Sequence, residues 1–132
     1  MIVLDASAVL ELLLNTTGGQ QVAQRIASPR ESLHAPHLLD IEVTQVLRRY
    51  THTNVVPADV AAAALADLGA LDVFRYGHGP FLPRMWELRD NLTAYDAAYV
   101  TLAETLDAPL LTFDAQLAGA PAHHATIELL PT

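Results

Sequence analysis

Two aspartates, each at the end of a short apolar run, suit the chemistry of a divalent-metal site. Asp5 follows the run at residues 2–4, and Asp114 follows the run at residues 109–113. Such runs are typical of buried strands in a parallel sheet, and ligands of open α/β sheets bind beyond the carboxyl ends of those strands. If the two strands lie side by side, the carboxylates share one crevice and repel each other unless a cation or a proton intervenes. The alternative is that each aspartate caps the helix that follows it.

Asp96 is a third candidate because it lies on an apolar face of its helix. The residues three, four and seven positions later on that face are Tyr99, Val100 and Ala103. We expect this face to be buried, and a buried carboxylate needs a partner. A capping box with Thr93 as the N-cap would account for the acidic residue but not for its place on the apolar side. The helix pattern alone leaves both interpretations open.

Glu42 is the fourth candidate, at the edge of the apolar stripe of its own helix. It lies three residues after Leu39 and four before Val46, whereas a fully solvated glutamate would lie further round the helix. The alternative is a boundary residue whose aliphatic stem packs while its carboxylate reaches water.

Taken together, these four acids indicate metal-dependent phosphodiester hydrolysis. Ligand sets made only of oxygen favour hard cations such as Mg²⁺ or Mn²⁺. Such a metal lowers the pKa of a bound water and stabilises charge on a phosphoryl oxygen.

The elements that must position these acids alternate between strands and helices. We expect strands at residues 2–5, 32–35, 71–74, 110–113 and 126–129. We expect helices at residues 7–14 (ended by Asn15 and a Gly18-Gly19 turn), 19–27, 37–50, 57–69, 84–90 and 94–107, and a brief one from residue 114. The loop at residues 77–83, rich in glycine and proline, is the strongest break. The alternation predicts one α/β domain over residues 1–132, with a mainly parallel sheet and helices on both faces.

The composition limits the classes of protein that fit. The chain has 132 residues, of which 52% are hydrophobic and 17% charged, as in one globular domain. No apolar run approaches the ~18 residues needed to span a bilayer, and the first run lacks the basic flank of a signal peptide. With no cysteine there is neither a disulfide nor thiolate chemistry. We expect a cytoplasmic protein.

The charge distribution narrows the function further. A formal net charge of -8 speaks against a large phosphate-binding surface, although a metal that bridges to phosphate, or a basic partner protein, is compatible with it. All seven basic side chains are arginine. The lack of lysine excludes a Walker-type phosphate loop and a Schiff-base enzyme. It also disfavours an acidic receiver-type signalling module, which uses a lysine beside its phospho-acceptor.

The four acidic segments together resemble the PIN-domain ribonucleases, most closely the VapC toxins of bacterial toxin–antitoxin pairs. The matching segments, in the order of the family and over nearly the whole chain, are residues 4–7, 41–43, 91–99 and 111–114. The third segment is the most specific, and the first is weak by itself. The resemblance implies a three-layer α/β/α sandwich with a mainly parallel central sheet. It also implies endonucleolytic cleavage of RNA with Mg²⁺ or Mn²⁺, a toxin homodimer, and a small VapB-like antitoxin that blocks the site.

Residue by residue, the resemblance implies three metal ligands: Asp5, Asp96 and Asp114. Glu42 would be a ligand, directly or through water, or would orient the attacking water. Ser7 and Thr112 match polar positions beside the site, where each could bond a ligand carboxylate or a metal-bound water. A structural role is the alternative for both, as an early helix hydroxyl and a β-branched strand residue.

Other polar and aromatic residues are expected to contribute little to the chemistry. Asp40 is expected to be a surface charge and stays a reserve candidate. A zinc site at His34 and His37 is disfavoured by the proline between them and the lack of cysteine. His123 and His124 are expected to be solvated. Residues with an RNA-contact and a structural alternative are Arg48, Arg49, Arg84, Arg89 and Trp86. Roles in helix entry and packing are expected for Asn91 and Tyr95.

Two other functions compete with a toxin nuclease. A catalytically inactive PIN-like scaffold, which binds a protein or RNA without cutting, is compatible with the acidic surface. A haloacid-type phosphatase also begins with an aspartate at a strand end, but it needs a second aspartate two positions later, where this chain has Ser7.

Overall fold

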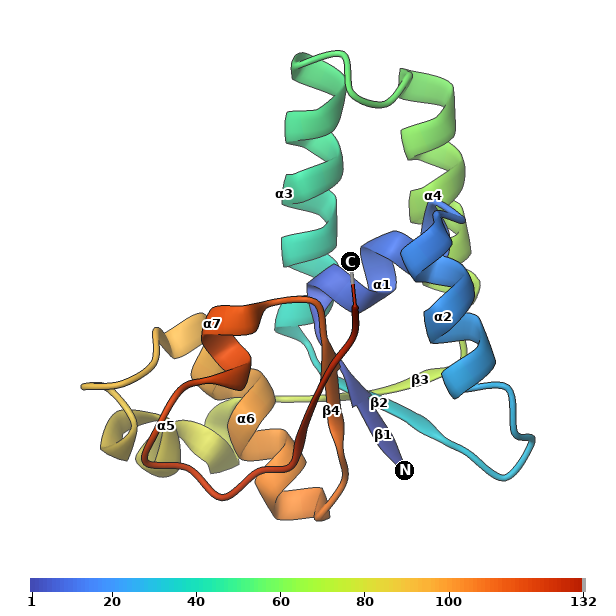
Figure 1. Ribbon diagram of the computed structural model, residues 1–132. Helices are drawn as coiled ribbons and strands as arrows, with labels where there is room; N and C mark the ends of the chain where they lie inside the picture. The colour runs from blue at the N-terminus through green and yellow to red at the C-terminus, as the bar shows by residue number, and fades with distance from the viewer. Residues whose placement is uncertain (132) are drawn as a thin grey trace.

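The computed structural model describes residues 1–131, and within them the chain forms a five-stranded parallel sheet flanked by helices (Figure 1). The strands are β1 (Ile2–Leu4), β2 (Leu33–Pro36), β3 (Val73–Tyr76), β4 (Leu110–Thr112) and β5 (Ile127–Leu129). Their order in the sheet is β3-β2-β1-β4-β5, and every neighbouring pair is parallel. The three-layer α/β/α sandwich with a parallel sheet is confirmed.

The strand order creates a point at which the direction of winding reverses. From β1 the chain proceeds through β2 to β3, and it then returns to the other side of β1 to form β4 and β5. The reversal lies between β1 and β4, where Leu4 is paired with Leu111. Because crossovers between parallel strands are right-handed, the helices before β3 and those after it lie on opposite faces. Ligands of such sheets bind beside the reversal, at the carboxyl ends of the strands.

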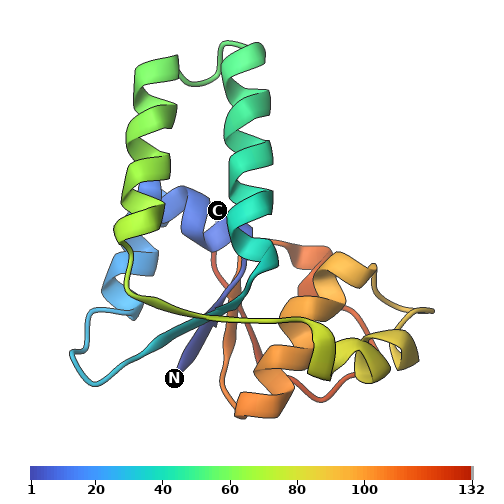
Figure 2. The ribbon, with the colours of Figure 1, turned by 180° about the vertical axis from the view of Figure 1, so that it is seen from behind.

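One layer consists of α1 (Ala6–Leu13), α2 (Thr17–Arg25), α3 (Leu38–His52) and α4 (Ala58–Ala70). Figures 1 and 2 show that α3 and α4 form a hairpin that extends beyond the carboxyl edge of the sheet. The buried side chains of α3 are Leu39, Val43 and Leu47, which lie on the predicted apolar stripe. This stripe fixes the rotation of α3 and therefore the direction in which Glu42 points.

The opposite layer contains the short 3₁₀ helix η1 (Gly79–Phe81) with α5 (Leu82–Glu87), α6 (Ala94–Leu106) and α7 (Ala115–Ala118). Helix α6 packs on β1, β2 and β4 and is buried continuously over residues 97–103. Thr93 caps its first turn, since the backbone N–H of Asp96 donates to the Thr93 hydroxyl over 3.2 Å. Thr93 is therefore the N-cap that was predicted for this helix start.

Three predicted boundaries are wrong. The loop at residues 77–83 contains η1 and the start of α5, where Pro83 occupies the first turn and its missing N–H costs nothing. The third strand lies at residues 73–76 rather than 71–74, because pairing of Val73 with Leu33 sets its register. Gly69 lies inside α4, which continues to Ala70.

The turn after α1 also differs from the expected Gly18-Gly19 turn. The chain turns at Asn15, which has a left-handed φ of 52°, and both glycines lie inside α2. A Cβ on Gly19 would lie 2.0 Å from the carbonyl oxygen of Glu11. Glycine is needed here because α1 and α2 approach so closely, not because the chain reverses there. Among residues 1–131, none of the helices has the length and apolar composition needed to cross a membrane.

Candidate active site

The four acidic residues predicted from the sequence lie at or near the ends of β1, β4, α6 and α3, and these elements meet near the reversal of the sheet (Figure 1). Asp5 directly follows β1 and caps α1. Asp114 follows β4 by two residues and caps α7. Asp96 is in the first turn of α6, and Glu42 is in the second turn of α3. Residues from both ends of the chain and from both helical layers are thus assembled at one edge.

Asp5 is the most tightly held of the four, with only 7% of its surface exposed. Its Oδ1 accepts hydrogen bonds from the Ala8 backbone N–H over 3.0 Å and from the Ser7 hydroxyl over 2.6 Å. Its Oδ2 accepts a short hydrogen bond from the Thr112 hydroxyl. Asp5 is therefore both the helix cap of the plainer interpretation and a carboxylate fixed at the reversal of the sheet.

Ser7 and Thr112 connect Asp5 to the end of β4. The Ser7 hydroxyl accepts from the Phe113 backbone N–H, and the Thr112 hydroxyl accepts from the Asp114 backbone N–H, each over 3.0 Å. The prediction that both hydroxyls bond a candidate ligand carboxylate is confirmed for Asp5. These two hydroxyl donors therefore hold the carboxylate of Asp5 in one orientation.

Sequence reasoning missed the residue that orients Glu42. The Tyr99 hydroxyl donates to Glu42 Oε1 over 2.6 Å, and Tyr99 is only 2% exposed. The signal was available in principle, because a buried tyrosine hydroxyl needs a hydrogen-bond partner and Tyr99 shares the helical face of Asp96. The partner itself, 57 residues away in the sequence, could not be identified from that face.

The acids lie close enough to alter one another's pKa. Burial is the largest cause that raises the pKa of Asp5, Glu42 and Asp96 above their ordinary values. The charge of Asp114 raises the pKa of Asp5 and of Asp96 further, while Asp96 and Asp5 do the same to Glu42. Hydrogen bonds from Ser7, Thr112 and Tyr99 oppose these effects but do not outweigh them. In the part of the chain that the structure describes, none of the four acids forms an ion pair.

Three of the seven arginines are paired with acids outside the cluster. Arg25 pairs with Glu128 over 2.8 Å, and Arg75 pairs with Asp40 over 2.9 Å. Asp40, the reserve candidate expected to be a surface charge, has 40% of its side chain exposed and is paired with Arg75 away from the site. Arg84, considered for RNA contact, instead pairs with the buried Glu104 over 3.0 Å.

The other predicted residues lie outside the cluster. Arg48 and Arg49 are exposed on α3, one to two turns beyond Glu42. Trp86 is 68% exposed and lies under the Arg89 guanidinium, at 4.6 Å from the ring centroid. Both ring nitrogens of His34 are engaged over 2.7 Å, with Ser32 and with Tyr76, so they are not available to a metal.

Of the two neighbouring histidines that were predicted to be solvated, His124 is exposed and His123 is not. His124 is exposed but donates from its backbone N–H to Glu104 over 2.9 Å, and its ring lies 3.3 Å from the same carboxylate. The ring of His123 is half-buried, and its Nδ1 accepts from the Ala125 backbone N–H over 3.1 Å.

The donor set fits a hard divalent cation in kind. Within residues 1–131, no three acidic or histidine side chains converge in a ready-made metal geometry. Asp5, Glu42 and Asp114 each direct at least one carboxylate oxygen at a protein donor. Each carboxylate keeps further lone pairs, and Mg²⁺ retains several waters that bridge to such oxygens. Coordination at this edge therefore needs small side-chain rotations or bridging waters.

Comparison with known proteins agrees with this arrangement. The family described as PIN domain matches residues 2–122. Three ribonucleases of Mycobacterium tuberculosis are similar over nearly the full length of both chains. VapC12 is 40% identical over 98% of this chain and 99% of its own length. VapC1 is 42% identical over 97% and 96%, and VapC9 is 42% identical over 99% of each chain.

Two solved structures share the fold. PAE2754 from Pyrobaculum aerophilum superposes with a TM-score of 0.69 at 25% identity, covering 96% of this chain and 81% of its own. VapC20 from Mycobacterium tuberculosis, described as a toxin that cleaves the sarcin–ricin loop, superposes with a TM-score of 0.68 at 16% identity. That superposition covers 94% of this chain and all of VapC20.

Proposed function

Because the chain belongs to the PIN-domain family and, within it, to the VapC ribonucleases, we propose that its four clustered acids are the active site of a metal-dependent endoribonuclease. The chain is an endoribonuclease toxin of the toxin–antitoxin type. We take residues 1–132 as a single PIN domain. The cytoplasm is the proposed compartment because it holds the RNA substrate.

The observation that carries the proposal is a cluster of carboxylates without a cationic partner. Burial and mutual repulsion raise the pKa of Asp5, Glu42 and Asp96, and the arginines that form ion pairs are committed to other acids. Repulsion between these carboxylates is unfavourable when nothing neutralises them, and a divalent cation among them makes the arrangement favourable.

In the proposed site, Asp5, Asp96 and Asp114 would hold Mg²⁺ or Mn²⁺, and the bound metal would supply an acidified water and neutralise charge on the phosphate. Glu42 would be a ligand, directly or through a water, or would orient the attacking water, and the Tyr99 hydroxyl orients the Glu42 carboxylate. Ser7 and Thr112 keep Asp5 pointed at the reversal of the sheet. The protein thus contributes orientation and a fixed negative charge at the position of the cation.

The proposed partners follow from the same charge. An antitoxin segment that carries arginine would neutralise the acids when it inserts among them, and so would block the site. We also propose a homodimer formed through α5, where Leu82 and Trp86 are 54% and 68% exposed. Sedimentation should give a dimer that Trp86→Glu converts to a monomer. A monomeric wild-type protein would contradict the dimer alone.

The decisive experiment is cleavage of RNA by the purified protein. Total RNA with Mn²⁺ should yield new, discrete ends that sequencing maps, and EDTA should abolish them. Asp114→Asn should yield no such ends while its circular dichroism stays that of the wild type. An active Asp114→Asn variant would refute the site assignment. Wild-type protein that neither binds Mn²⁺ nor cleaves RNA would favour an inactive scaffold.

A further inference from the structure

A groove leads away from the acidic cluster between the start of α6 and the helix α7. It has a volume of about 380 Å³, within the range of about 300–1,000 Å³ that small-molecule sites occupy. Asp96 lines it at the cluster, and residues 119–121, which follow α7, line it on the far side. Figure 1 shows α7 beside the start of α6, at the same edge of the sheet as the acids. A substrate bound at Asp96 would therefore also contact this groove, because Asp96 lines it.

The lining of the groove is chemically selective. Two exposed amide side chains, Asn91 and Gln116, line it together with Thr93. Leu92 and Leu117, both buried, provide apolar surface. An amide offers one acceptor and two donors, the complement of a nucleobase edge. No arginine is among the lining residues in the described part of the chain, so the groove lacks the charge that attracts phosphate.

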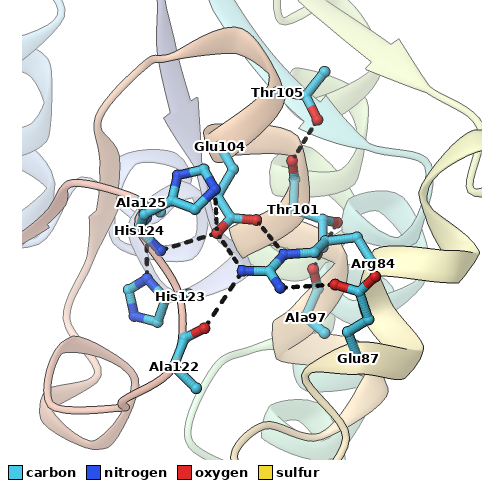
Figure 3. Close-up of polar contacts among 10 residues, drawn as sticks. All are labelled: Arg84, Glu87, Ala97, Thr101, Glu104, Thr105, Ala122, His123, His124 and Ala125. Atoms are coloured by element: carbon cyan, nitrogen blue, oxygen red, sulfur yellow. Dashed lines mark hydrogen bonds and ion pairs between the residues drawn. The ribbon is translucent and has the colours of Figure 1, made fainter.

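The far wall of the groove leads into a residue with a strained backbone conformation. It continues into Ala122, whose φ of 75° is unfavourable for a residue with a Cβ. Figure 3 shows what holds this segment. Arg84 Nη2 donates to the Ala122 carbonyl over 3.4 Å, and the His124 backbone N–H donates to Glu104 over 2.9 Å. Strained backbone persists only where its surroundings determine it, and Arg84 and Glu104 supply such surroundings for the segment that follows the far wall.

We propose that this groove binds the base of the nucleotide next to the scissile phosphate, and that Asn91 and Gln116 select that base through its hydrogen-bonding edge. The inference rests on the proposed ribonuclease function. With the scissile phosphate at the acids, the neighbouring nucleotide is the part of a single-stranded RNA that reaches the groove. Sequence-specific recognition of RNA uses unstacked bases whose edges are free and whose faces pack on the protein, and the amides and leucines provide both contacts.

The test compares cleavage preference in Asn91→Ala, Gln116→Ala and a matched control. Gln24→Ala is the control, because Gln24 is an equally exposed amide on α2, away from the groove. Each protein is incubated with Mn²⁺ and an RNA pool randomised around a fixed core, and both new ends are sequenced. Wild type and Gln24→Ala should prefer one base at one position beside the cut. Each groove variant should weaken that preference about fivefold or more, with unchanged Mn²⁺ affinity.

Several results would overturn the inference. One is a wild type without any base preference beside the cut, and another is an unchanged preference in both groove variants. Weaker binding of an antitoxin peptide with unchanged cleavage preference would assign the groove to the antitoxin instead. Absence of RNA cleavage by the wild-type protein can be told apart from these results, because it contradicts the proposed ribonuclease function as well as this inference.

Discussion

Helix α6 carries one acidic residue near each end, and the two have opposite surroundings. Asp96, in the first turn, lies among other acids, and burial together with the charge of Asp114 raises its pKa. Glu104, two turns later, is only 5% exposed, so desolvation raises its pKa, but Arg84 and His124 outweigh this and lower it overall. A carboxylate on α6 therefore has a structural role where an arginine pairs with it, and it stays available for function where no cation pairs with it.

The distribution of arginine extends this contrast to the whole molecule. Arg25 joins α2 to β5, Arg75 joins β3 to α3, and Arg84 joins α5 to α6. Each pair joins two elements, which for Arg25 and Arg75 are not consecutive in the sequence. Perturbed acids that lack such partners are characteristic of functional sites, and here they gather at the reversal of the sheet.

Removing the charge at the active end of α6 should have the largest effect on activity. Asp96→Asn deletes a proposed metal ligand, so kcat should fall about a thousandfold. Without metal, the variant should be more stable than the wild type, because burial and then repulsion by Asp114, which raise the pKa of Asp96, no longer act on a charged group. RNA cleavage assays and urea unfolding in EDTA measure the two effects. Retained cleavage, or a less stable variant, would break the contrast between the two ends.

Addition of Mn²⁺ should stabilise the protein through Asp96, the acid in the first turn of α6. Mn²⁺ at about one hundred times its Kd should add about 2.7 kcal/mol to the free energy of unfolding. The gain should vanish in Asp96→Asn and persist in Glu104→Gln. Thermal unfolding with and without Mn²⁺ gives the comparison. An equal gain in Asp96→Asn would place the cation elsewhere.

Removing the cation at the structural end should cost stability rather than catalysis. Arg84→Ala leaves Glu104 buried with an unpaired charge, and the free energy of unfolding should fall by about 2 kcal/mol. Arg30→Ala, at an exposed arginine, is the control and should change it by less than about 0.5 kcal/mol. Urea unfolding measures both variants. Equal stability of the two variants would show that the Arg84 pair contributes nothing.

Removal of the hydrogen bond that orients Glu42, with Glu42 itself kept, should have a smaller effect on activity. Tyr99→Phe deletes the hydroxyl that donates to Glu42, and kcat should fall about tenfold with little change in KM. Tyr95→Phe, at an exposed tyrosine on the same helix, should match the wild type. In a Glu42→Ala background, Tyr99→Phe should add less than about twofold if Tyr99 acts through Glu42. A full tenfold loss in that background would instead indicate a packing role.

The smallest expected effect is the opposite pH dependence of the two ends. The pKa of Glu104 in the folded state lies below its ordinary value of 4.5. Its contribution is therefore present above that value and is lost as pH falls through the folded pKa. The pKa of Asp96 is raised from 3.8, so its cost is absent below 3.8 and grows as pH rises through the folded pKa.

Unfolding in EDTA between about pH 3 and 7 tests this difference. Toward neutral pH, Asp96→Asn should become progressively more stable than the wild type, and Glu104→Gln progressively less stable. Two curves that run parallel to the wild type would contradict the opposite assignments.

Local sequence patterns predicted most of the fold and the identity of the four acids. Apolar runs gave the strands, the helical stripe placed Glu42 at a buried edge, and the capping box placed Thr93 and Asp96 at a helix start. The boundaries that failed were those set by contacts between elements. The third strand continues to Tyr76 because this residue pairs with Pro36, and position 19 is glycine because Glu11 lies against it.

The sequence by itself determined which acidic and basic groups this protein has and that the acids lie at the ends of its elements, because those signals are carried by neighbouring residues. Only the tertiary structure decided which acid receives an arginine and which receives a tyrosine hydroxyl. Arg84 and Glu104 are 20 residues apart, and Tyr99 and Glu42 are 57 apart. Such pairs form when strand order and helix packing bring distant segments together, and a local sequence pattern contains no information about those contacts.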